Sequence, residues 1–176
     1  MKIAYVTSAK RGRSDSLLAE LAEDLRAEGR RLTGIVKDQS YAGHYANGCD
    51  MKIRVLPAGP VIRITQNLGQ GSDACRLDPA AITEAAARAE ANLMGDTDLF
   101  ILNKFGPEEC SGRGFYTLIA TAMEAGIPVL LGVSTTCEAA FATFSGGLAE
   151  ALPDDPAELR NWCAKVIPDR KTHTPA

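Results

Sequence analysis

The sequence predicts an α/β fold, with a mostly parallel sheet, helices on both of its faces and an inserted β-hairpin. Three observations lead to this fold class. A strand–helix–strand unit opens the chain, two apolar strands separated by a helix follow later, and one stretch between them alternates apolar and polar residues. Strands buried on both faces read as continuous apolar runs and need crossover helices. Alternation over a short stretch is typical of a hairpin with one solvated face.

The opening unit has its first strand at Lys2–Ser8 and its second at Arg31–Val36. Four leucines between positions 17 and 25 recur at helical spacing, and Gly29 is suited to end that helix. The connection between the strands is expected to be right-handed. Ligands of open α/β sheets bind beyond the carboxyl ends of the strands, so the turn at Thr7–Ser16 is a candidate binding loop.

The middle of the chain predicts a hairpin over about 51–66, around the turn "PAGP", and a helix that begins at Pro79 with Asp78 as its N-cap. A buried strand at Asp98–Leu102, a helix over 114–125 and a second buried strand at Ile127–Val133 follow.

The last part of the chain is expected to be mainly helical. Thr135 and Glu138 have the spacing of a capping box. The helical stretch that they open is followed by a last helix from Pro156 to Ile167. We expect a single domain over 1–167 and a disordered polar tail over 168–176.

Composition excludes several function classes for this chain of 176 residues. Its 45% hydrophobic and 23% charged residues are typical of a globular protein, and a net charge of −3 gives no reason to expect nucleic-acid binding. No apolar run approaches the roughly 18 residues of a membrane span, so no membrane partner is expected and the cytoplasm is the expected location. The five cysteines lack CxxC spacing and only two histidines are present, which favours reduced thiols and no tightly bound metal.

The turn before the first helix carries cations where a helix N-terminus favours an anion. Against the phosphate-binding pattern GxxxxGK[ST], the segment keeps its second glycine and its hydroxyl, whereas Thr7 and an arginine replace the first glycine and the lysine. Asp15 is expected to cap the helix and to compete with an anion. The candidate residues here are Lys10, Arg11, Gly12, Arg13 and Ser14.

The strand at 98–102 ends on Asn103 and Lys104, followed by "FGPEEC". This segment resembles the strand end "DEIGPMEL" of the small P-loop nucleoside triphosphatases of thermophilic microbes and animals. The order of elements over residues 1–133 is similar to that family too, which implies a three-layer P-loop-NTPase-like fold. In that resemblance, Asn103 and Lys104 stand where the family has its acidic pair, while Glu109 is kept.

A second resemblance extends over the whole chain. The stretches "RITQNLGQGSDACRLDP", "LNKFGPEECSGRGF", "AGIPVLLGV" and "EAAFATFSGG" look like a bacterial family of uncharacterised proteins. Its members are similar to the triphosphatases but lack their catalytic set, and their genes often lie near those for molybdenum transport or nitrogen fixation.

Hydrolysis of a nucleoside triphosphate needs an acid that holds the magnesium shell and a second acid that orients water. Asn103 and Lys104 supply neither, so we expect negligible hydrolysis and a non-hydrolytic pocket for a metal-free anion, either a nucleotide phosphate or an oxyanion such as molybdate. Besides the turn residues, the candidate set comprises Cys75, Arg76, Asn103, Lys104, Glu109 and Arg113.

Three alternatives stay open. Asn103 and Lys104 could pair with Glu108 and Glu109 in a closed ion-pair network that binds nothing. The chain could be a pseudo-enzyme adaptor for a protein partner in metal transport or cofactor assembly. It could also be an enzyme of another reaction type that uses Cys75 or Glu109.

Overall fold

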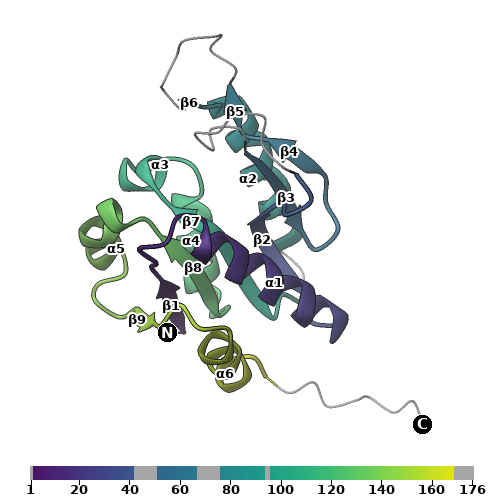
Figure 1. The fold of residues 1–176 in the computed structure, drawn as a ribbon, viewed down its shortest axis with the longest axis vertical. Coiled ribbons are helices and arrows are strands. Elements are labelled where there is room, and N and C mark those ends of the chain that lie inside the picture. The colour runs from purple at the N-terminus through teal and green to yellow at the C-terminus, as the bar shows by residue number, and fades with distance from the viewer. Residues whose placement is uncertain (1, 42–50, 67–75, 94–95, 169–176) are drawn as a thin grey trace.

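The computed structural model describes residues 2–41, 51–66, 76–93 and 96–168, and its centre is a seven-stranded sheet of order β4-β3-β2-β7-β8-β1-β9 (Figure 1). Strands β2, β7, β8, β1 and β9 are parallel, while β3 and β4 form an antiparallel hairpin on β2. The strands are β1 (Ile3–Val6), β2 (Leu32–Lys37), β3 (Lys52–Leu56), β4 (Val61–Arg63), β7 (Leu99–Phe105), β8 (Val129–Val133) and β9 (Glu150–Leu152), and β5 (Thr65–Gln66) pairs with β6 (Arg76–Leu77) in a small second sheet.

Helices cover both faces of the sheet, so the molecule has three layers. On one face, α1 and α6 pack Leu18 and Trp162 against residues such as Leu130 of β8. On the other face, α2, α4 and α5 surround Leu131, the next residue along the same strand. Adjacent residues of β8 therefore belong to opposite cores, which is why this strand is apolar throughout. The helices are α1 (Arg13–Ala27), α2 (Pro79–Leu93), α3 (Pro107–Cys110), α4 (Tyr116–Glu124), α5 (Glu138–Phe144) and α6 (Pro156–Val166).

The predicted α/β class, parallel strands and hairpin are confirmed, as is the helix start at Pro79, where Asp78 Oδ1 accepts from the N–H groups of Ala80 and Ala81. Gly29 has a φ of 78° just beyond α1, as a left-handed helix end requires. Among the described residues, none of the helices combines the length and apolar character that crossing a membrane requires.

Two predictions for the C-terminal part were wrong. The capping box at Thr135 and Glu138 does not form, because Thr135–Cys137 is a 3-10 turn and α5 begins at Glu138 without a side-chain cap. The helix also stops early, since Gly146 and Gly147 both adopt positive φ, and the chain then forms β9 on the edge of β1. The predicted disordered tail, apart from Pro168, lies outside the described residues.

An irregularity near the end of β7 positions the residues of interest. The register against β8 shifts between Leu102 and Phe105, which lie opposite Leu131 and Val133, so the β7 side holds one extra residue. A bulge of this kind redirects side chains at a strand end. Gly132 of β8 permits it, because a Cβ there would collide with the backbone oxygen of Asn103.

Candidate functional site

The first turn of α1 and the end of β7 meet at Asp15. Asn103 Nδ2 donates to Asp15 Oδ1 at 3.3 Å, and Lys104 Nζ lies 3.9 Å from the same oxygen. Lys37, at the end of β2, places its Nζ 3.9 Å from Asp15 Oδ2. The Asp15 side chain is only 5% exposed, so a buried carboxylate is surrounded by two ammonium groups and an amide. Three strand or helix ends thus converge on one charge.

The sheet order explains this convergence. β2 and β7 are parallel neighbours, so their carboxyl ends bring Lys37 next to Asn103. Asn103 Oδ1 accepts from the Lys37 N–H at 3.1 Å, which fixes the amide between β2 and α1. The prediction that Asp15 caps α1 was wrong: Gly12 is the N-cap, with a φ of 76°, and Asp15 turns to the sheet instead.

The cations of the candidate turn do not all join this cluster. Arg13 Nη2 donates to the backbone oxygen of Asp154 at 3.5 Å, in the loop between β9 and α6. Lys10 is exposed, and its backbone N–H donates to Ser8 Oγ at 3.2 Å. Arg13 begins α1, and β9 and β7 lie on opposite sides of β1 in the sheet, so the partner of Arg13 and Lys104 flank the start of α1 on two different sides. The structure therefore brings Lys104 to α1 and pairs Arg13 with a different neighbour.

The remaining residues of the turn have simpler roles in the fold. Gly12 provides the left-handed turn into α1, and Ser14 is buried in the first turn of that helix. Arg11 is exposed. Cys75 and the side chain of Arg76 lie outside the described residues, although the backbone of Arg76 belongs to β6.

Glu108 and Glu109 have partners other than Asn103 and Lys104. Glu108 receives two hydrogen bonds from Arg113, at 2.9 and 3.2 Å, and these bonds and the guanidinium charge lower the pKa of Glu108. Glu109 is buried and accepts from the N–H groups of Gly106 and Phe115, both at 3.0 Å. The alternative in which Asn103 and Lys104 pair with these two glutamates was therefore wrong in its partners, because Asp15 is the carboxylate that they face.

Burial is the main influence on Glu109 and raises its pKa, while the two backbone hydrogen bonds oppose that rise. The carboxylate joins the strand end to the start of α4, across the turn that contains α3. Gly114 makes room for it, since any Cβ at that position would overlap Glu109 Oε1. This arrangement makes Glu109 a structural clamp of the turn.

Two participants, Asp15 and Lys37, were missing from the predicted site set. Asp15 had been assigned to capping, and Lys37 had not been considered. A usable signal existed for Lys37, because it follows a predicted strand of the parallel sheet, and strand ends of one sheet share an edge.

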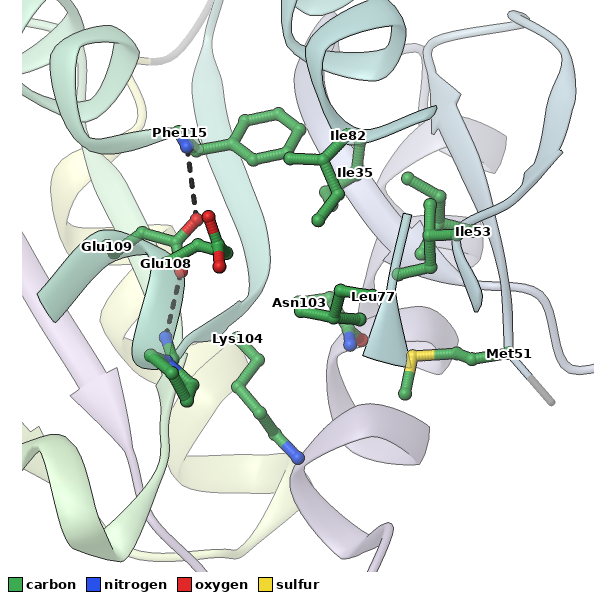
Figure 2. Close-up of a pocket in the computed structure, with 13 residues that line it drawn as sticks. Ile35, Met51, Ile53, Leu77, Ile82, Asn103, Lys104, Glu108, Glu109 and Phe115 are labelled. Carbon is green, nitrogen blue, oxygen red and sulfur yellow. Dashed lines mark hydrogen bonds between the residues drawn. The ribbon is translucent and has the colours of Figure 1, made fainter. Parts of the chain in front are cut away.

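A pocket of about 100 Å³ lies beside this cluster, between the hairpin side of the sheet and the turn after β7 (Figure 2). Asn103 and Lys104 form part of its wall, and Glu108 and Glu109 lie across from the hairpin. The rest of the wall is apolar and includes Ile35, Ile53, Ile82 and Phe115. Among the described residues, no group of three or more His, Cys, Asp or Glu side chains is placed to hold a metal ion.

Solved structures share this fold. THEP1 from the hyperthermophile Aquifex aeolicus superposes with a TM-score of 0.63 at 14% identity, over 95% of this chain and 97% of that one. A human cancer-related nucleoside triphosphatase superposes with a TM-score of 0.61 at 12% identity, over 94% and 95% of the two chains. At these identities the likeness establishes the fold, which is that of the P-loop nucleoside triphosphatases.

Sequence comparison identifies a relative within a much longer protein. The chain is 37% identical over 150 residues to the molybdenum import ATP-binding protein ModC 2 of Bradyrhizobium diazoefficiens. The match covers 84% of this chain but only 16% of that protein, so the chain spans about a sixth of its relative's length. A family model described as a protein of unknown function, DUF2478, matches residues 3–162. The chain belongs to the DUF2478 family.

Proposed function

We propose that this chain binds the phosphate groups of a nucleotide, or a small oxyanion, at the turn between β1 and α1 and does not hydrolyse what it binds. One observation carries the proposal: Asn103 and Lys104 lie against the first turn of α1, at Asp15. Hydrolysis on this fold needs an acid at such a strand end to hold magnesium and a group that orients water. An amide and an ammonium do neither, but both attract an anion.

The charges around Asp15 favour an external anion. One carboxylate faces the ammonium groups of Lys37 and Lys104, which leaves a net charge of +1 in the cluster. The side chains of these lysines are 33% and 42% exposed, so a solute can reach them. The N–H groups of the first turn of α1 add the positive end of the helix dipole. Gly12 leaves this helix end without a side-chain cap.

The same charges disfavour magnesium. Mg²⁺ prefers carboxylate, phosphate and water oxygens in an octahedral shell. Asp15, the carboxylate at the start of α1, already faces two lysines and the Asn103 amide. An anion held here would therefore be neutralised by the lysines, with no metal required.

Isothermal titration calorimetry tests the proposal directly. ATP, ADP, tripolyphosphate, phosphate, molybdate and tungstate are each titrated with either magnesium or EDTA present. We expect at least one anion to bind equally well in EDTA, and Lys104→Met to weaken it about tenfold or more, since a charge-assisted hydrogen bond contributes about 1.5–3 kcal/mol. Arg88→Met is the matched control, because Arg88 pairs with Glu84 on α2, away from the site. Binding that requires magnesium, or a panel in which nothing binds, would contradict the proposal.

A second candidate function rests on the longer relative. A domain like this one forms about a sixth of a protein named for molybdenum import and ATP binding. In this second candidate, the chain acts as an adaptor to a molybdenum-import ATPase in the cytoplasm. An anion panel without binding, together with a stable complex between the purified chain and such an ATPase, would favour the adaptor over the binding protein.

A further inference from the structure

The pocket beside Lys104 is almost wholly apolar, although it adjoins a charged cluster. Its inner wall is built from Ile35 of β2, Ile53 of β3, Ile82 of α2 and Phe115, which converge from distant parts of the chain (Figure 2). All four residues are buried, with exposed fractions between 1% and 8%. The space that they enclose, about 100 Å³, is therefore an apolar recess at the carboxyl edge of the sheet.

Among the described residues, the polar side chains on this wall already have hydrogen-bond partners, with one exception. Both polar atoms of Asn103 are engaged, by Lys37 and by Asp15. Both oxygens of Glu109 accept backbone N–H groups, and both oxygens of Glu108 are bound by Arg113. A ligand in the recess therefore meets few groups that could recognise a polar edge.

Lys104 is the exception. Its stem lines the pocket and its ammonium extends from the pocket toward α1, as Figure 2 shows. Its single described ion pair, with Asp15 at 3.9 Å, is longer than a hydrogen bond, and the side chain is 42% exposed. The recess is thus apolar inside and has a cation at one end.

We propose that the recess holds the compact apolar group of a phosphate monoester, whose phosphate lies at Lys104 and the first turn of α1. The inference rests on the anion site of the proposed function and names an apolar phosphate ester, in place of a nucleotide, as the ligand class of that site. An apolar cavity of about 150 Å³ is known to bind benzene. At about 100 Å³, this recess encloses about four carbon atoms, and because it is open to solvent it suits a group of about four to six, the larger of which would protrude at the open side.

A nucleobase fits the recess poorly for the same reasons. Its ring edge carries several donors and acceptors, and burying such groups without partners is unfavourable. Asn103, Glu108 and Glu109 have their polar atoms engaged and would have to break existing bonds to read that edge. The apolar monoester is therefore favoured over a nucleoside monophosphate at this site.

The test compares four ligands by calorimetry on the full chain: inorganic phosphate, phenyl phosphate, isopentyl phosphate and AMP. Each CH₂-sized group buried contributes about fourfold in affinity. We expect phenyl phosphate and isopentyl phosphate to bind at least about thirtyfold tighter than phosphate, and tighter than AMP. Lys104→Met should weaken all four.

Two variants separate the recess from the anion site. Ile82→Phe fills the recess and should reduce the preference for phenyl phosphate over phosphate to about twofold, while phosphate binds as before. Leu148→Phe is the control, since Leu148 is 61% exposed and does not line the pocket.

Because Ile82→Phe could fail to fold, isoleucine methyl NMR on the unmodified chain gives a second measurement. Phenyl phosphate, but not phosphate, should shift the methyl resonances of Ile35, Ile53 and Ile82. The methyl resonance of Ile167, in the opposite core, should not change.

The outcomes of these experiments distinguish the proposed apolar recess from the proposed anion site. Phosphate binding with no gain for phenyl phosphate, or AMP binding tightest, would overturn the recess proposal and leave the anion site standing. Failure of every phosphate ligand, together with the oxyanions of the first panel, would overturn both.

Discussion

Asn103 donates its side-chain amide to the buried carboxylate of Asp15, 88 positions away in the chain and 3.3 Å away in space. Through this bond the end of β7 is attached to the first turn of α1, where proteins of this fold class bind phosphate. Asp15 thereby acts as an internal anion at the site. An external anion would share Lys37 and Lys104 with it.

Replacing Asp15 should therefore strengthen binding. Asp15→Asn removes a negative charge from the lysines, and we expect phosphate affinity to rise roughly tenfold at low salt. The cost in stability should stay near about 1 kcal/mol, because both lysines are partly solvated. Calorimetry and urea unfolding measure the two effects. Asp96→Asn, which breaks an exposed pair with Arg31, is the control, and equal affinity in the two variants would contradict this role for Asp15.

The wild-type chain should not turn over ATP at a rate typical of enzymes. With an amide and an ammonium at the strand end, the electrostatic contributions to the transition state are missing. We expect phosphate release, followed with a coupled assay in magnesium, to stay far below about 1 per second. A rate at or above that value would show that other residues supply the catalytic groups.

Restoring an acid at the strand end should destabilise the fold. Asn103→Asp would place a second carboxylate beside Asp15, so the pair would share a proton and one pKa would rise. A raised carboxyl pKa gives stability at low pH that is lost as pH increases. We therefore expect a loss of about 1–3 kcal/mol at pH 8 that diminishes toward pH 5, measured by urea unfolding. Asn103→Ala serves as the comparison, because its loss should not depend on pH.

Glu109 should matter for folding and not for chemistry. In Glu109→Gln the amide nitrogen would face a backbone N–H of Gly106 or Phe115, two donors in contact, at a cost of about 1–3 kcal/mol. Gly114→Ala should be destabilising as well, since φ is +59° there and the added methyl group would strike the Glu109 carboxylate. Thermal unfolding measures both. A variant of normal stability that had lost anion binding would instead place Glu109 in the site.

The thiol of Cys110 should react slowly. Although the residue is exposed, partial desolvation of its sulfur and the neighbouring Cys137 thiol raise the pKa of Cys110 to about 11. At pH 8 the thiolate is then scarce, so alkylation by iodoacetamide should be roughly a hundredfold slower than that of a free thiol and should keep increasing above pH 10. Peptide mass spectrometry over a pH series resolves the site. A rate whose midpoint lies near pH 8.5 and that levels off at higher pH would mean an ordinary thiol.

Periodicity predicted most of the fold, because it depends on local patterns of apolar residues. The strands at the centre of the sheet are continuous apolar runs, and the 51–65 stretch alternates, so both could be read directly. β9 could not be read, because its three residues are largely exposed and form a strand only by pairing with β1. The glycines at 146 and 147 were the sequence signal that the preceding helix ends there.

The site was predicted less completely than the fold. Asn103 and Lys104 could be identified because they follow the apolar run at 98–102, although β7 continues through them to Phe105. Their partner Asp15 was misassigned, since the choice between capping a helix and facing a strand end depends on where the sheet lies. The role of Glu109 depends on two backbone N–H groups that no sequence pattern reveals, and the apolar recess is assembled from elements too distant in the chain to be matched in advance.

The extra residue in β7 has a consequence for how this strand end can change. Asn103 and Lys104 are the two residues between Leu102 and Phe105, so deleting either one would restore regular pairing with β8 and leave one of these two side chains at the strand end. A substitution here alters one contact, whereas a single-codon deletion would remove one of the two polar side chains and also redirect the other. The length of this segment therefore decides whether the amide and the ammonium can both face Asp15.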